Sequence, residues 1–175
     1  MRWPARKGGR EMGAKAAVVH AMHRLYGRAV HPQAHTVAES AASGSVDTLD
    51  GSHYCLVLSL RRDGTPVPTP VWFGVEDGRI YFRAEAGSGK LKRIRANPSV
   101  RVARCGARGR PSAPPFEGTA RLVPPDEEAR AERAIQRNYG RGRRVYERWL
   151  TLPDGAYVEI TPAQSPSATD CPQSQ

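Results

Sequence analysis

The stretch that most constrains the fold is residues 65–95, in which two strand-like runs are followed by a glycine-rich loop and a basic segment. Apolar and small residues alternate along the first run, which places Val67, Thr69, Val71, Phe73 and Val75 on one face and Pro68, Pro70, Trp72 and Gly74 on the other. Asp77-Gly78 separates the two runs, and this dipeptide is a strong signal for a β-hairpin. The stretch therefore predicts a hairpin that leads into a helix.

The loop after the hairpin reads Gly87-Ser88-Gly89 and opens the basic segment. Backbone N–H groups at a helix start are free to bind an anion, and the helix dipole favours negative charge there. Lys90, Lys92 and Arg93 bring positive charge to the same place. We interpret the stretch as a phosphate seat beside a flat strand surface, which suits a phosphorylated planar cofactor.

This loop has two alternative interpretations. A charged run at helical spacing is usually a solvated helix face, and on spacing alone that alternative is about as good. A nucleotide-binding P-loop is excluded, because that motif requires a glycine where Ala84 stands and a serine or threonine where Leu91 stands.

The remaining pattern predicts a mainly β protein. Further strands are expected over residues 54–60, 100–105, 117–123 and 156–161. The basic helix should end at Asn97-Pro98. A helix should begin at the acidic residues 126–128 and run to about Tyr139, with Gly140 as its stop and a second short helix around residues 146–150. Six short strands with tight turns fit a small antiparallel β-barrel better than a doubly wound sheet.

Charge is unevenly distributed along this 175-residue chain, whose formal net charge is +10. Residues 1–35 hold seven Lys or Arg and one Glu, and residues 86–116 hold eight basic and no acidic side chains. An excess of this kind suits either an anionic cofactor or nucleic acid. The odd count of three cysteines, Cys55, Cys105 and Cys171, argues against a disulfide framework, and we expect the first two to be buried free thiols.

A resemblance to a known family accompanies these motifs. Residues 62–66, 68–73 and 89–95, followed by Asn97-Pro98 and residues 117–122 and 157–162, are similar to the pyridoxamine 5′-phosphate oxidase-like split-barrel family, and above all to its coenzyme F420-dependent branch. The resemblance covers residues 50–162. It implies a six-stranded antiparallel split β-barrel of the FMN-binding type, which normally forms a homodimer with the cofactor at the interface.

The resemblance also implies which residues bind the cofactor. The matching strand lies along the cofactor ring in this family, and the matching loop and helix bind its phosphate. The expected ring contacts are therefore Thr69, Pro70, Val71 and Trp72, and the expected phosphate contacts are Ser88, Gly89, Lys90 and Arg93. Arg83 is a weaker candidate, and Arg104, Arg108 and Arg110 are either contacts to an anionic tail or solvated turn residues.

No constellation for nucleophilic catalysis can be assembled, and no catalytic residue is assigned. The histidines His20, His23, His31 and His35 are loosely spaced and have no cysteine or carboxylate to complete a metal site, so no metal is expected.

Three functions follow, in order of preference. The first is an F420-dependent oxidoreductase that transfers a hydride between the deazaflavin and a small organic acceptor. The second is an FMN-binding oxidoreductase or flavin carrier of the same fold. The third, a basic nucleic-acid-binding barrel, is disfavoured because base stacking needs exposed aromatic rings, and alternation should bury about half of those near Trp72.

The expected organisation has three parts. Residues 1–45 form a basic, partly disordered N-terminal extension with a helix over residues 16–30; residues 46–162 form the barrel; and residues 163–175 form a disordered tail. No apolar run reaches the roughly 20 residues of a membrane helix, and the N-terminus lacks a signal-peptide core, so a cytoplasmic protein without membrane contact is expected.

Overall fold

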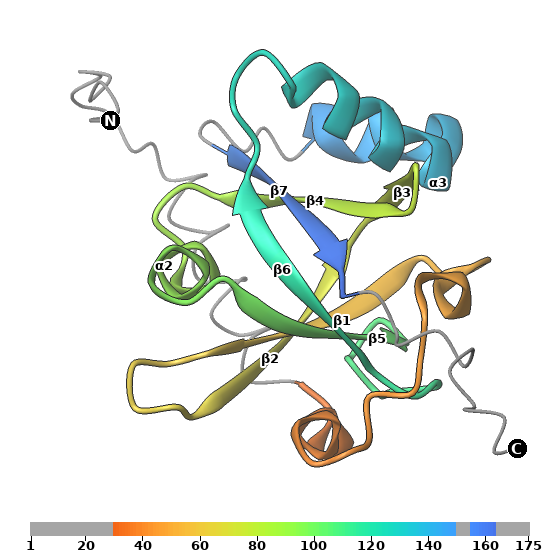
Figure 1. Ribbon diagram of the computed structural model, residues 1–175. Helices are drawn as coiled ribbons and strands as arrows, with labels where there is room; N and C mark the ends of the chain where they lie inside the picture. Colours follow the sequence, from red (N-terminus) through yellow and green to blue (C-terminus); the bar gives the residue numbers. More distant parts are fainter. Residues whose placement is uncertain (1–29, 150–154, 164–175) are drawn as a thin grey trace, which may run out of the picture.

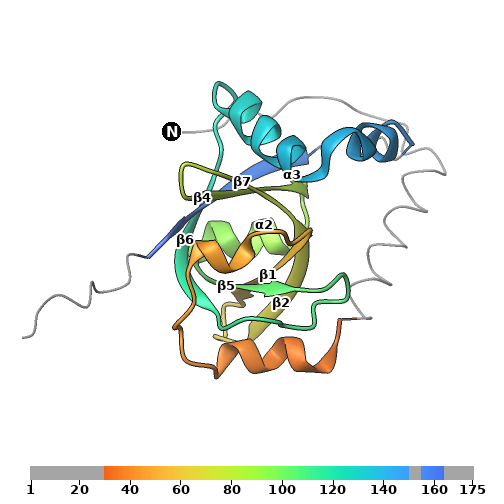
Figure 2. The same ribbon diagram turned by 90° about the vertical axis from the view of Figure 1, so that its right-hand side faces the viewer.

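The computed structural model describes residues 30–149 and 155–163. Seven strands form one antiparallel sheet that curls around a common core (Figures 1 and 2). The spatial order is β2-β1-β5-β6-β7-β4-β3. The strands are β1 Tyr54–Leu60, β2 Pro66–Trp72, β3 Gly74–Glu76, β4 Arg79–Glu85, β5 Ser99–Cys105, β6 Phe116–Leu122 and β7 Gly155–Pro162. The predicted mainly β split barrel is confirmed, with one strand more than expected.

The additional strand arises because the run over residues 65–75 is broken at Phe73 into β2 and β3. Beyond the break Val75 is 36% exposed, so it does not share the buried face of Val71 and Phe73 as its alternation predicted. Gly74 shows why the chain turns here. A Cβ at Gly74 would overlap the carbonyl group of Ala134, so helix α3 (Glu128–Trp149) approaches the backbone at a distance that only glycine allows.

Both predicted hairpin turns are present. Asp63 and Gly64 connect β1 to β2, whose register runs from Tyr54 opposite Trp72 to Leu60 opposite Pro66. Asp77 and Gly78 connect β3 to β4 with φ of 49° and 69°. Two successive positive φ values match the turn whose twist suits a hairpin, which explains why this dipeptide is informative.

The main core lies inside the curled sheet. Side chains from all strands but β3 meet there with Leu91 and Ile94 of helix α2 (Gly89–Ala96), which covers the barrel opening (Figure 2). The helix ends at Asn97 as predicted, and Ser99 N donates to the Asn97 side chain at 3.0 Å.

Strand β1 is buried on both faces rather than on one. Cys55 and Val57 face the main core, while Leu56 and Leu58 face a second cluster. The 3₁₀ helix η1 (Pro32–Ala38) covers this second face through buried Ala34 and Val37, and a shorter 3₁₀ helix, η2 (Val46–Leu49), adds Leu49 to the main core (Figure 2). The compact structure therefore includes residues before position 46.

The long C-terminal helix corrects the sequence prediction. Gly140 does not end a helix at Tyr139, because α3 continues through it to Trp149 as one element. A glycine inside a helix costs only about 1 kcal/mol, and no proline follows before residue 153 to enforce a stop. The predicted apolar stripe of Ala131, Ala134 and Ile135 is confirmed, since it packs on Tyr81 and Val123.

A buried charge network fixes the sheet beside α3. The carboxylate of Glu159, which is 1% exposed, accepts hydrogen bonds from Arg121, Arg79 and the Tyr81 hydroxyl at 2.8–3.0 Å. Burial alone would raise the pKa of Glu159, but the hydrogen bonds from Arg121 and Tyr81 hold it below its usual value.

Two further expectations concern the rest of the chain. Cys55 and Cys105 are free and buried, as expected. Within the described residues, no helix is long and apolar enough to cross a membrane. The expected helix over residues 16–30, the C-terminal tail and Cys171 lie outside the part that the structure describes, apart from Val30 and Ala163 at its edges.

Candidate functional site

Ser88 sits at the start of α2 with an unused hydroxyl. It is the N-cap residue, yet its side chain makes no capping hydrogen bond. Its Oγ is buried and has no hydrogen-bond partner among the described residues. Gly87, with φ of 83°, turns the chain out of β4 so that Ser88 enters the helix in an extended conformation. A buried polar atom without a partner is costly, and such atoms in a structure call for a ligand, a water or an ion.

Lys90 lies two residues after Ser88, in the first turn of α2. Its side chain is partly buried, and no hydrogen bond or ion pair joins it to any described residue. Burial, together with the charge of Arg93, lowers the pKa of Lys90 to about 8, although Glu85 acts in the opposite direction. An anion bound here would therefore raise the pKa of this lysine towards its ordinary value.

Arg93 joins the start of α2 to the sheet. Its Nε donates to Ser59 Oγ on β1 at 2.9 Å, and its guanidinium lies against Gly89, where an added Cβ would stand 3.0 Å from Nη1. Burial and the nearby Arg61 lower the pKa of Arg93. Ser59 was not among the predicted site residues, since a serine at an inward-facing strand position carries no distinctive sequence signal.

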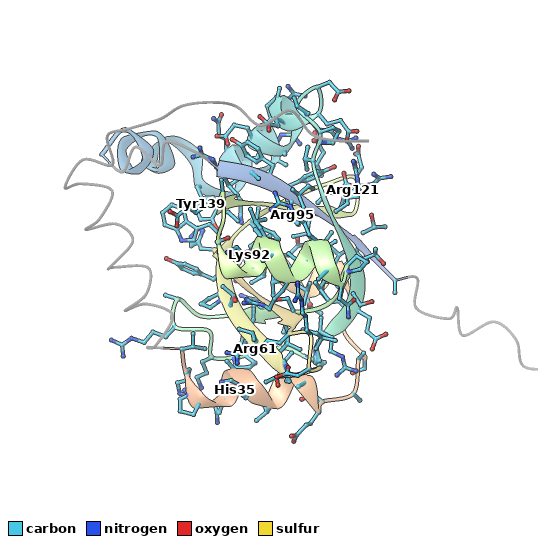
Figure 3. The ribbon with its side chains drawn as sticks, turned by 90° about the vertical axis from the view of Figure 1, so that its left-hand side faces the viewer. His35, Arg61, Lys92, Arg95, Arg121 and Tyr139 are labelled. Carbon is cyan, nitrogen blue, oxygen red and sulfur yellow. The ribbon has the colours of Figure 1, made fainter. Side chains whose placement is uncertain are left out.

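Ser88, Gly89, Lys90 and Arg93 thus come together at one end of α2, as their sequence spacing implies. Figure 3 shows the outer side of the same helix, where Lys92 and Arg95 are exposed. Among the residues that the structure describes, the seat combines a hydroxyl without a partner, the N–H groups of the first helical turn and basic side chains. Phosphate groups are bound in proteins by groups of these kinds, so the start of α2 is suited to a phosphorylated ligand.

Strand β2 carries the four residues expected to contact a cofactor ring. Thr69, Pro70 and Trp72 are partly buried, whereas Val71 is 5% exposed and belongs to the main core. β2 is an edge strand of the sheet. Its prolines at positions 66, 68 and 70 cannot donate to a ladder, so they occupy the positions whose nitrogens face away from β1.

Trp72 is part of an aromatic cluster with residues of β1 and α3. Its ring stacks on Tyr139 with 5.0 Å between centroids and an interplanar angle of 25°, and it meets Tyr54 edge-on at 6.2 Å. Tyr139 also lies beside His53, with 5.6 Å between the ring centroids. The indole is therefore positioned by packing on Tyr54 and Tyr139.

Asn138 and Tyr139 of α3 hold this cluster in place. The hydroxyl of Tyr139 accepts from Phe73 N at 3.0 Å and donates to His53 O. The amide of Asn138 donates to Ser52 O and Phe73 O, both at 3.0 Å. These bonds link α3 to Phe73, at the break between β2 and β3, and to the two residues that precede β1. Neither residue was identified from the sequence, since the partners lie more than 60 positions away.

Arg83, the weaker candidate, lies on β4 with its guanidinium carbon 5.9 Å from the ring centroid of Tyr157 on β7. An added Cβ at Gly155 would overlap this guanidinium. Arg83 is thus packed beside β7.

The strand register sets the distance between the two halves of the site. Arg93 meets β1 at Ser59, which is opposite Val67, while the aromatic cluster lies at Tyr54, which is opposite Trp72. Five residues of strand span about 17 Å. The phosphate seat and the aromatic cluster therefore lie at opposite ends of the β1–β2 pair, with Thr69 and Pro70 between them.

The comparisons with known proteins agree with this fold. A sequence model of the family described as pyridoxamine 5′-phosphate oxidase matches residues 45–165. No curated protein matches the chain.

Several solved structures share the fold. The conserved hypothetical protein Rv2991 from Mycobacterium tuberculosis is 21% identical, with a TM-score of 0.52 over 68% of this chain and 78% of that one. A putative 5-nitroimidazole antibiotic resistance protein from Bacteroides thetaiotaomicron is 15% identical, with a TM-score of 0.53 over 67% and 77%. The heme storage protein HutZ from Vibrio cholerae is 12% identical, with a TM-score of 0.54 over 68% and 87%. At these identities the likeness is one of fold.

Proposed function

Since the chain belongs to the pyridoxamine 5′-phosphate oxidase family, we propose that it is an F420-dependent oxidoreductase that transfers a hydride between this deazaflavin and a small organic acceptor. The observation that carries the proposal is the seat at the start of α2. There Ser88 Oγ, a buried hydroxyl without a hydrogen-bond partner among the described residues, lies two residues from Lys90, a partly buried cation that forms no ion pair with any of them. A protein with no ligand would gain nothing from this arrangement.

Different residues would bind the phosphate and the ring of the cofactor. Ser88, the backbone of Gly89, and Lys90 would bind the phosphate, while Arg93 is anchored to Ser59 and adds its remaining N–H groups. Thr69, Pro70, Val71 and Trp72 would lie along the ring. When bound, the cofactor supplies the hydride chemistry, and the protein supplies binding, orientation and exclusion of water.

FMN is the second candidate, because it shares a tricyclic ring and a phosphate with F420. Residues 86–116 hold eight basic side chains and no carboxylate, which favours the longer and more anionic oligoglutamyl coenzyme. We also propose that two copies of the chain form a homodimer with the cofactor at their interface, as in the family it resembles.

Nucleic-acid binding receives no support from the aromatic residues. Phe73, Tyr81 and Phe82 are at most 2% exposed, so they cannot stack on bases. Trp72 is already stacked on Tyr139.

Titration of purified apoprotein with F420 and with FMN, under matched conditions, tests the proposal. We expect micromolar or tighter binding of F420 that weakens as salt rises, since exposed basic groups contribute to it. If FMN binds tenfold more tightly than F420, the cofactor is FMN and the F420 proposal is wrong. Binding of neither would refute a redox cofactor at this site.

A further inference from the structure

A cavity of about 680 Å³ opens at the end of β1 and β5, next to the aromatic cluster. The residues that line it include His53, Tyr54, Arg104 and Arg110. Tyr54 is the residue that meets Trp72 edge-on, so the cavity adjoins the end of β2 that the proposed ring site reaches.

The two arginines give the cavity a specific charge. No acidic residue lines it. Neither Arg104 nor Arg110 forms a hydrogen bond or ion pair through its side chain with any described residue. Elsewhere in the described chain, arginines near carboxylates pair with them, as Arg101, Arg121 and Arg130 do. The cavity therefore presents two unneutralised guanidinium groups, and guanidinium is the side chain best suited to bind a carboxylate.

The wall that bears these arginines is held in one conformation. The turn after β5 folds back on itself, with Gly106 N bonded to Arg110 O at 3.0 Å and Ser112 N bonded to Arg104 O at 2.9 Å. Gly109, with φ of 80°, packs so closely on β1 that an added Cβ would stand 3.2 Å from a methyl group of Leu56. Such a backbone positions the arginines better than a free loop would.

We infer that this cavity binds the carboxylate of an acidic, planar acceptor, which Arg104 and Arg110 recognise while His53 and Tyr54 contact its planar part. The inference rests on the proposed function. The acidic tail of F420 is the other source of carboxylates, but that tail is attached beyond the phosphate, whereas the cavity lies at the ring end, about 17 Å away along β1.

Phthalate is a suitable probe, with neutral benzamide as its uncharged counterpart, and calorimetry on the full-length protein measures both. We expect phthalate to bind at least tenfold more tightly than benzamide. Arg110→Gln and Arg104→Gln should each weaken phthalate binding at least fivefold. Arg108→Gln is the matched control, because Arg108 lies on the same turn but does not line the cavity, and it should change the affinity by less than twofold.

The possible outcomes distinguish the carboxylate of an acceptor from that of the F420 tail, and the cavity from the proposed function. If Arg110→Gln weakens binding of F420 but leaves phthalate unaffected, the cavity is a tail site and the inference fails. It also fails if phthalate and benzamide bind equally, or if Arg108→Gln is as harmful as the other two. If phthalate binds as expected while neither F420 nor FMN binds, the cavity stands and the proposed function falls. Arg110 is exposed on a turn, so Arg110→Gln should fold normally. It therefore tests the cavity even if Arg104→Gln folds poorly.

Discussion

At the start of α2, Lys90 is partly buried and has no anionic partner among the described residues. A buried charge of this kind makes the apoprotein less stable than it would be with an apolar side chain of similar shape. The same charge becomes favourable once a phosphate is bound. Lys90 therefore links the stability of the apoprotein to the affinity for the cofactor, and the two should respond to substitution in opposite directions.

Lys90→Met should stabilise the apoprotein at pH 7 by about 1–3 kcal/mol. The folded pKa of about 8 lies below the ordinary value of 10.5, so the unfolded state binds more protons between these limits. Stability of the wild-type protein should accordingly rise as pH increases from 8 to 10.5, and the variant should lack this rise. Thermal unfolding across that range measures both, and a lower melting temperature for Lys90→Met at pH 7 would contradict the account.

Cofactor affinity should depend on pH through the same residue. Lys90 with a pKa of about 8 is mostly charged at pH 7 and mostly neutral at pH 9. If the seat needs the ammonium form, affinity should fall about tenfold over that range. Cofactor titrations at constant ionic strength measure this dependence. In Lys90→Met the affinity should hardly change between pH 7 and pH 9. An equal dependence of affinity on pH in both proteins would rule out Lys90 as the titrating group.

At the scale of elements, α3 holds the aromatic cluster. Asn138 and Tyr139 satisfy backbone groups of Phe73, Ser52 and His53 across the break between β2 and β3. Sequence patterns predicted the strands, the hairpins and the apolar stripe of α3, because these depend on local periodicity and turn chemistry. They did not predict the break at Phe73 or the anchoring by Asn138, because both depend on where a distant helix packs on Gly74.

Asn138→Ala should lower the free energy of unfolding by about 1–3 kcal/mol, since two backbone carbonyl groups lose their hydrogen bonds. It should also change the near-ultraviolet circular dichroism, because the stack of Trp72 on Tyr139 loosens. Arg133→Ala on the exposed face of α3 is the control and should change stability by less than about 0.5 kcal/mol. Equal effects of the two substitutions would show that Asn138 has no anchoring role.

At the scale of the whole molecule, the fold was more accessible from sequence than the site. The positions of the strands along the chain follow from runs and turns that can be read locally, whereas their spatial order does not. Ser88, Lys90 and Arg93 lie at one end of the same helix, so their grouping was foreseeable. η1 was not foreseen as part of the structure, because Ala34 and Val37 are two small apolar residues in a polar stretch. Arg101 donates to the carbonyl groups of Val37, Ala38 and Ser40, which ties this segment to β5 over about 60 positions.

Light scattering should report a homodimer, with twice the 19.1 kDa mass of one chain. If the cofactor lies between two copies, its addition should lower the dissociation constant of the dimer, because a ligand that binds only the assembled state stabilises it. A monomer at all concentrations, with and without F420, would contradict the proposed interface.

The most direct test of the phosphate seat compares Lys90→Ala with Lys92→Ala. Both remove a lysine from α2, but Lys92 is exposed on its outer side (Figure 3). Loss of a charge-assisted contact worth about 1.5–3 kcal/mol should weaken cofactor binding by about tenfold to 150-fold in Lys90→Ala. Lys92→Ala should change the affinity by no more than about threefold, which reflects screened surface charge. Equal affinities of the two variants would contradict the claim that the start of α2 binds a phosphorylated cofactor.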